Sequence, residues 1–182
     1  MGIGLFFVTI VSFSSFLQGG SADYEHHIST SKRSSPFEVA LENLQKQLGY
    51  EFQSRGLLRR AMTHPSFSGE NNKALSILGA GVIETSVALS SISRNAEIST
   101  KDLNRRIIDI FEVNSCAADG LALGLQNVVR VSRKTNASMP VVVCGAVRAV
   151  FGAVAIDATT VDVASKVFWT VHGDGGLQLR AS

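Results

Sequence analysis

The chain of 182 residues is poor in proline, cysteine and net charge, and each scarcity excludes a class of protein. Three prolines and a hydrophobic share of 45% argue against an intrinsically disordered chain. A net charge of +2 gives no electrostatic reason to expect tight nucleic-acid binding, which normally shows as a strongly basic surface. The chain is long enough to bury a core without metal or disulfide bonds, so we expect one domain with short extensions.

Residues 1–22 have the pattern of a secretory signal peptide. An uncharged apolar run at 5–17 is too short to span a bilayer comfortably, and small residues suited to cleavage follow at 19–22. No Lys or Arg precedes the run, which leaves an uncleaved anchor or an organelle-targeting sequence as alternatives. We expect a secreted protein or one in the endoplasmic reticulum lumen, with an organelle or the nucleus as alternatives. Once the leader is removed, we expect no stable membrane span.

Two further features fit the secretory pathway. Asn136 begins a glycosylation triplet, Asn-Ala-Ser, in a polar stretch. The two cysteines, Cys116 and Cys144, could form a disulfide in an oxidising compartment, or could be small buried apolar side chains. We favour the second interpretation, because both cysteines lie within helical patterns.

The spacing of apolar residues predicts a helical domain at 36–171, after a polar linker at 23–35 and before a Gly-rich tail at 172–182. Ser35 can cap the first helix, with Glu38 completing the capping box. Further helices are predicted after Ser54, after Asn71 or Asn72, after Ser99, from Asn114 and from Thr159. The residues expected to face inward in the third and fifth helices are Leu75, Leu78, Val82 and Leu89, then Ala117, Ala118 and Leu121.

Residues 141–154 are ambiguous. The run Val-Val-Val-Cys favours a strand by local propensity. The valines at 143, 147, 150 and 154 recur at spacings of three and four, which indicates a helix, and Ser138 as a cap with Pro140 in the first turn agrees. We choose a helix, so the fold class is all-α.

The stretch 61–83 resembles the signature of the ribonuclease III family, in which a Thr-His-x-Ser turn leads into an Asn-Glu-Arg-Leu-Glu-Phe-Leu-Gly-Asp-Ala-Val-Leu helix. Two further segments are similar to the family: Leu-Gly-Tyr-Glu-Phe at 48–52 and Gly-Ala-Val-Ala-Ile-Asp at 152–157. The apolar positions of the signature that agree are Leu75, Ile77, Leu78, Gly79, Val82 and Ile83. The resemblance implies the single-domain helical fold of the ribonuclease III endonuclease.

The catalytic acids of the family are not kept. The resemblance implies four acids on two helices that hold Mg²⁺ for phosphodiester hydrolysis in double-stranded RNA, since this hard cation needs oxygen ligands. Counting along the motifs places those four positions at Ser76, Ala80, Gly145 and Arg148. We therefore expect no bound metal, no cofactor and no family catalysis. A site rebuilt from Glu70, Glu84 and Asp157 is an alternative, which would keep RNA cleavage or processing.

His64 lies in the Thr-His-Pro-Ser turn, where we expect it to hold the start of the next helix rather than to act as a catalyst. The family resemblance also implies a homodimer, in which the signature helix contributes to the subunit contact. Within the family, the chain resembles the plant ribonuclease III-like proteins named for defective nuclear fusion, and this resemblance implies a part in karyogamy. We expect a non-enzymatic interaction module, and double-stranded RNA binding is a disfavoured alternative.

Overall fold

The computed structural model describes residues 35–173, so the predicted leader, most of the linker and the tail beyond 173 lie outside it. Within this range all regular elements are helical apart from one isolated parallel bridge between Thr63 and Arg130, which confirms the all-α prediction. The helices are α1 Pro36–Leu48, α2 Arg55–Ala61, α3 Lys73–Arg94, α4 Thr100–Phe111, α5 Val113–Ala122, the short 3-10 helix η1 Leu125–Asn127, α6 Pro140–Asp157 and α7 Val161–His172.

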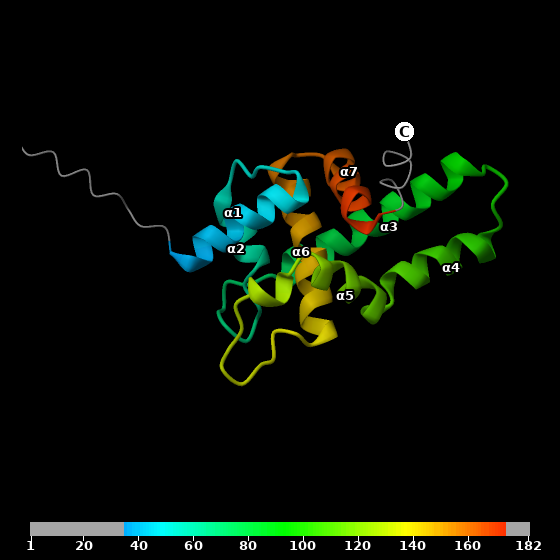
Figure 1. Cartoon of the computed structure of the whole chain (residues 1–182). Helices are drawn as coiled ribbons and strands as arrows, with labels where there is room; N and C mark the ends of the chain where they lie inside the picture. The colour runs from blue at the N-terminus through cyan, green and yellow to red at the C-terminus, as the bar shows by residue number, and fades with distance from the viewer. Residues whose placement is uncertain (1–34, 174–182) are drawn as a thin grey trace, which may run out of the picture. The chain divides into compact units, whose positions relative to one another are not determined.

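Helix α6 is the centre of the described domain, and α2, α3, α5 and α7 pack against it (Figure 1). The valine-rich run is helical, as predicted, and Pro140 occupies the first turn without needing a backbone N–H donor. The predicted cap is wrong in detail, because Met139 and not Ser138 occupies the N-cap position. Every residue from Ala149 to Ala155 is buried. A helix that is apolar all round is stable only when neighbours cover all its sides.

Both α3 and α6 are long and apolar enough to cross a membrane by length and composition alone. The apolar window of α6 is 67% buried inside the bundle, so its hydrophobicity is explained by the core. The corresponding window of α3 is only 39% buried, which leaves part of its apolar surface without a partner among the described residues.

Local signals define α1, as the sequence predicts. The Ser35 hydroxyl accepts a hydrogen bond from the Glu38 N–H, and Gly49 ends the helix in the left-handed conformation with φ of 63°. Ser54 precedes α2, but its side chain makes no capping bond. Instead Asp157, at the end of α6, accepts hydrogen bonds from the backbone N–H groups of Gln53 and Ser54. The segment that leads into α2 is therefore held by a residue about a hundred positions away, which no local pattern shows.

The prediction for the inward face of α3 is wrong at two positions. Leu75 and Val82 are buried, but Leu78 is 40% exposed and Leu89 is 58% exposed. Helix α6 covers only the side of α3 that carries Leu75 and Gly79, and Leu78 and Leu89 lie away from it. The C-terminal half of α3 and the whole of α4 run as a pair beyond the helices around α6 (Figure 1), and no residue of α4 is fully buried.

Helix α5 also differs from the prediction. It begins at Val113 rather than Asn114, because the Glu112 carboxylate accepts a hydrogen bond from the Ser115 N–H and caps the helix. Ala117 is buried as expected, whereas Ala118 and Leu121 face solvent. The face toward α6 is instead formed by Cys116, Ala117 and Gly120. The small residues allow α5 to lie close to α6, and the larger apolar Leu121 is left outside.

The structure joins Cys116 to Cys144 in a disulfide, against our preference for two free thiols. The two Cα atoms lie 5.2 Å apart, within the range that a disulfide needs, and both residues are buried between α5 and α6. Helical patterns had suggested separate buried side chains, but two packed helices bring residues 28 positions apart into bonding range. A loop of this length stabilises a fold by about 3 kcal/mol in chain-entropy models.

Candidate functional site

Helices α3 and α6 cross at a pair of glycines. A Cβ atom added to Gly79 would lie 1.7 Å from the carbonyl oxygen of Arg148, and one added to Gly152 would lie 2.1 Å from the carbonyl oxygen of Leu75. These distances leave no space for a methyl group, so both glycines are required for the close approach. The cost of a glycine inside a helix, about 1 kcal/mol relative to alanine, is offset by this backbone contact.

The four positions that the sequence motifs predict to correspond to the family's acids lie near this crossing. Ser76 and Ala80 lie four residues apart on α3, on either side of Gly79. Gly145 and Arg148 lie three residues apart on α6, on the same helical face as Gly152. All four are partly exposed. The fold thus keeps the framework of a two-helix site, and the side chains within it are a hydroxyl, a methyl, a hydrogen and a guanidinium.

Arg148 has a structural contact of its own. Its Nη2 donates a hydrogen bond of 3.0 Å to the carbonyl oxygen of Phe111, the last residue of α4, and its guanidinium carbon lies 5.0 Å from the Phe111 ring centroid. The final carbonyls of a helix have no partner within the helix and carry partial negative charge, so a cation there is favourable. Burial lowers the pKa of Arg148. Arg148 therefore ties α6 to the junction of α4 and α5.

The residues at this crossing do not fit Mg²⁺. Mg²⁺ takes oxygen ligands, chiefly carboxylates and water, in near-octahedral geometry. Ser76 supplies one neutral hydroxyl, Ala80 and Gly145 supply no donor, and Arg148 brings a positive charge that would repel the ion. Within residues 35–173, no group of three or more His, Cys, Asp or Glu side chains converges as a metal site would require.

The three acids considered for a rebuilt metal site have different surroundings. Asp157 uses one carboxylate oxygen to accept from the Tyr50 hydroxyl and the Gln53 N–H, and the other to accept from the Ser54 N–H. Glu84 is exposed on α3, and Glu70 lines a cavity at the end of α2. The structure therefore brings these acids to three different settings.

His64 stabilises its own turn and not, as we expected, the start of the next helix. Its Nδ1 lies 2.8 Å from the Ser66 hydroxyl, and the same hydroxyl accepts a hydrogen bond from the Ser132 N–H. Its backbone N–H donates to the Arg130 carbonyl oxygen at 2.9 Å. Burial and the charge of Lys73 lower the pKa of His64, which favours a neutral ring. The turn is thus linked to the segment after η1 rather than only to the start of α3.

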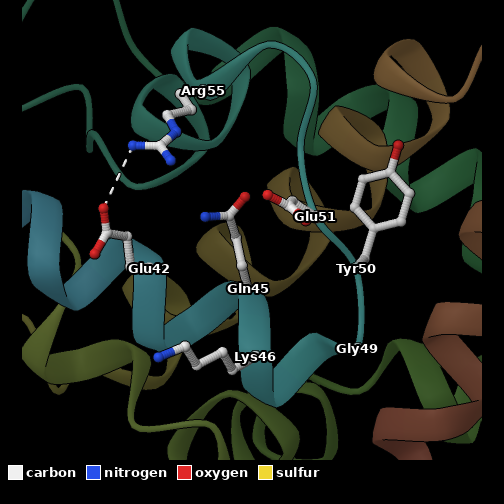
Figure 2. Close-up of a pocket in the computed structure, with 7 residues that line it drawn as sticks. All are labelled: Glu42, Gln45, Lys46, Gly49, Tyr50, Glu51 and Arg55. Carbon is white, nitrogen blue, oxygen red and sulfur yellow. Dashed lines mark hydrogen bonds and ion pairs between the residues drawn. The ribbon is translucent and has the colours of Figure 1, made fainter.

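A cavity of about 390 Å³ lies elsewhere, between α1 and the segment that leads into α2. Figure 2 shows Glu42 and Arg55 facing each other as an ion pair at 3.4 Å, with Gln45 and Lys46 on the same helix α1. The Gln45 Oε1 accepts a hydrogen bond from the Phe52 N–H, so it serves the loop. Two acids and two bases line this cavity, which gives it no preference for a ligand of one charge.

The comparison with protein families decides what this framework is. The ribonuclease-III-like family model matches residues 54–171, which include both helices of the crossing. The chain belongs to the ribonuclease III-like family. Within that family it is 51% identical over 172 residues to Protein NUCLEAR FUSION DEFECTIVE 2 of Arabidopsis thaliana, covering 94% of this chain and 87% of that protein.

Bacterial members are more distant. Ribonuclease 3 of Albidiferax ferrireducens is 35% identical over 119 residues, which is 63% of this chain and 52% of that enzyme, so the chain spans about half the length of this bacterial relative. The solved nuclease domain of ribonuclease III from Campylobacter jejuni superposes with a TM-score of 0.69 at 26% identity, over 72% of this chain and 95% of that domain. The described part of this chain therefore has the fold of a ribonuclease III nuclease domain.

Proposed function

We propose that this ribonuclease III-like domain is catalytically inactive and serves as a non-enzymatic interaction module. The observation that carries the proposal is the crossing of α3 and α6, where Ser76, Ala80, Gly145 and Arg148 replace the acids that the family uses to hold Mg²⁺. The guanidinium of Arg148 is directed to the Phe111 carbonyl oxygen and stabilises the fold. A site of this composition neither binds the metal nor activates a water molecule for attack.

The interaction that we propose is self-association into a homodimer. Four large apolar side chains of α3 are exposed: Ile77 at 77%, Leu78 at 40%, Leu89 at 58% and Ile92 at 46%. Apolar surface gathered on one helix generally marks a binding surface. The related Campylobacter jejuni nuclease domain was described for a region involved in dimer formation, which supports a second copy as the occupant. Light scattering that finds only monomers at micromolar concentration would refute this part of the proposal.

We place the protein in the secretory pathway, with the endoplasmic reticulum lumen as its setting. The buried disulfide supports an oxidising compartment. Asn136 is exposed in the loop before α6, and its Oδ1 accepts a hydrogen bond from the Ser138 N–H, so its side-chain amide is accessible to modification. The loss of a mass corresponding to one glycan after Asn136→Gln, in protein made by a plant cell, tests this placement.

The name of the Arabidopsis relative suggests a cellular role for the protein in nuclear fusion. A part in karyogamy, such as the fusion of polar nuclei in the female gametophyte, fits a lumenal protein because the nuclear envelope is continuous with the endoplasmic reticulum. Failure of the chain to restore nuclear fusion in a plant that lacks the relative would contradict this role, provided that the protein accumulates at normal levels.

The decisive experiment restores the acids. The purified chain and a variant carrying Ser76→Glu, Ala80→Asp, Gly145→Asp and Arg148→Glu are each titrated with Mg²⁺ and Mn²⁺ in the presence of labelled double-stranded RNA. We expect no cleavage by the natural chain at any metal concentration, and a metal-dependent rise in melting temperature only in the four-acid variant. Metal-dependent cleavage by the natural chain that disappears in Glu84→Gln would overturn the proposal.

A further inference from the structure

A small cavity at the C-terminal end of α2 gathers arginines. It measures about 220 Å³, and we call it the arginine pocket. Its lining comes from α2, from the turn that follows and from Arg130, three positions after η1. The lining residues are Gly56, Arg59, Arg60, Thr63, Phe67, Ser68, Glu70 and Arg130. Three guanidinium groups and one carboxylate therefore meet in a space that suits a small ligand.

Arg130 is held in place on this wall by two aromatic rings. Its guanidinium carbon lies 4.3 Å from the centroid of the Phe37 ring and 4.8 Å from that of the Phe67 ring. Its Nη2 donates a hydrogen bond of 2.6 Å to the Thr63 hydroxyl oxygen. That hydroxyl donates in turn to the Arg59 carbonyl oxygen, which fixes its orientation. A guanidinium that is already immobilised loses little side-chain entropy when it binds an anion.

The donors of Arg130 are incompletely used. Its bond to Thr63 is the one hydrogen bond that this guanidinium makes to the rest of residues 35–173, and its Nε is buried without an acceptor. A guanidinium has five N–H donors, and a buried donor without a partner is costly. The Thr63 oxygen is already engaged as a donor to Arg59. The pocket therefore holds an oriented cation with unfilled hydrogen-bonding capacity.

The charge of the pocket is also unbalanced. Arg59 pairs with Glu38 and lies over the same Phe37 ring as Arg130, at 5.8 Å from its centroid. No ion pair joins Arg60, Glu70 or Arg130 to any other part of the described chain. Burial and the nearby charge of Arg59 lower the pKa of Arg130, and Glu38 offsets them only in part. Like charges kept together in this way are stabilised by an anion between them.

We propose that the arginine pocket binds the phosphate monoester group of a small ligand. Arginine donates two parallel hydrogen bonds to phosphate, and several arginines around one cavity are suited to its multiple oxygens. Ser68 adds a hydroxyl to the lining, and Phe67, 49% exposed, adds a ring surface at which a planar group of the ligand can stack. The volume of about 220 Å³ suits a group of the size of a phosphate, and a duplex would need a far larger basic surface.

The proposal goes beyond the interaction module described above and does not depend on an inactive crossing. The arginine pocket is lined by residues of α2, the following turn and Arg130, whereas the crossing is formed by α3 and α6. Binding of a phosphate ligand and cleavage of RNA are measured separately. Either proposal can therefore fail while the other stands.

The test is a calorimetric titration of the full chain with inorganic phosphate and, in a second arm, with adenosine monophosphate. We expect saturable binding that weakens about tenfold or more in Arg60→Gln and in Arg130→Gln, as the loss of a charge-assisted hydrogen bond predicts. Arg60 is exposed, so its variant keeps the fold even if Arg130→Gln impairs folding. Glu70→Gln should bind phosphate a few times more tightly, because it removes the pocket's unpaired negative charge.

Arg55→Gln is the matched control, since Arg55 lies on the same helix but pairs with Glu42 at the other cavity (Figure 2). Its affinity for phosphate should equal that of the natural chain. If adenosine monophosphate binds more tightly than phosphate, and Phe67→Ala abolishes this difference, the ligand of the pocket is a nucleotide. If the two affinities are equal, the pocket recognises the phosphate group alone. The absence of saturable binding in both arms, or equal weakening in Arg55→Gln and Arg60→Gln, would overturn the proposal.

Discussion

The two faces of α3 are both apolar, but one is buried in the domain and the other is exposed. One face carries Leu75, Gly79 and Val82, and α6 covers it so closely that backbone atoms meet. The other face carries Ile77 and Leu89, which are mostly exposed to solvent. The buried face contributes to folding within one chain, whereas the exposed face is the surface on which we propose that a second copy binds. Both faces are apolar, so apolar character does not distinguish the two roles. The close approach of the α6 backbone to one face does distinguish them.

The difference is visible in the residues as well as in their burial. The buried face has glycine at its centre, which is unfavourable in an isolated helix and is explained only by a close neighbour. The exposed face has large apolar side chains that the described part of the chain leaves between 40% and 77% exposed. Large side chains left exposed generally serve association, because their burial against a partner releases ordered water. Each prediction below tests one side of this comparison.

The largest effect is expected at the crossing. Gly79→Ala places a methyl group within 1.7 Å of the Arg148 carbonyl oxygen and should lower the free energy of unfolding by about 3 kcal/mol or more. Gly81→Ala, on the same helix, adds a methyl group with no atom within 4 Å and should raise it by about 0.5–1 kcal/mol. Urea unfolding at low protein concentration measures both. Equal effects of the two substitutions would show that α3 and α6 do not meet at Gly79.

Substitutions on the exposed face of α3 should weaken dimer formation and leave the stability of the monomer nearly unchanged. Leu89→Lys introduces a charge at a position that is already exposed, so the melting temperature of the monomer should be nearly unchanged. In a two-fold dimer the substitution occurs twice, and we expect the dimer dissociation constant to rise about a hundredfold. Analytical ultracentrifugation checks this, with Gln47→Lys on α1 as the control. An unchanged dissociation constant would place the subunit contact elsewhere.

Arg148 should matter for stability and not for chemistry. Arg148→Met removes the hydrogen bond to the Phe111 carbonyl oxygen and the contact with its ring, and should cost about 2 kcal/mol. Arg105→Met, at an exposed position on α4, should change stability by less than about 0.5 kcal/mol. Differential scanning calorimetry compares them. If the two variants melt together, the guanidinium of Arg148 does not support the α4–α5 junction.

The smallest effect concerns pH. Burial alone would raise the pKa of Asp157, but hydrogen bonds from the Ser54 and Gln53 N–H groups and from the Tyr50 hydroxyl outweigh it, so the pKa is lowered. The stabilisation is therefore present above the ordinary carboxyl pKa near 4 and is lost as pH falls through the lower folded-state value. Asp157→Asn should show a weaker loss of stability on acidification, measured by urea unfolding at several pH values. Parallel acid profiles of the two proteins would contradict this.

The same hydrogen bond acts in the opposite direction on Tyr50. Burial, the bond to Asp157 and the charge of that carboxylate raise the pKa of Tyr50 to about 12. A group with a raised folded-state pKa stabilises the protein below its unfolded value near 10 and loses that effect as pH rises further. The contact between α6 and the segment before α2 is thus weakened at both extremes of pH.

Much of the fold could be predicted from local patterns. Ser35 and Ser99 cap their helices as expected, and the valine spacing at 143, 147, 150 and 154 correctly outweighed strand propensity. These predictions succeed because a cap or a periodic stripe depends on atoms within a few residues. The hydrogen bonds from the segment before α2 to Asp157, and the disulfide, were missed because each joins positions far apart in the chain.

Of the two candidate sites, one could be predicted from the sequence and the other could not. The loss of acids at Ser76, Ala80, Gly145 and Arg148 can be seen in the sequence, because a substitution of residue type is local information. The arginine pocket could not be seen. Two adjacent arginines such as Arg59 and Arg60 are not a binding motif, and nothing in the sequence placed Arg130 against Phe37 and Phe67. Only packing of three separate segments brings these side chains to one cavity.

By itself, the sequence determined the helices, the caps of α1 and α4, and the absence of carboxylates at the crossing, because these depend on residue type and short-range spacing. The tertiary structure alone decided which apolar face of α3 is buried, that Cys116 and Cys144 are bonded, and that Arg148 reaches the end of α4. The physical reason is that burial, disulfide formation and long-range hydrogen bonds depend on distances between elements, and those distances are fixed only when the helices pack against one another.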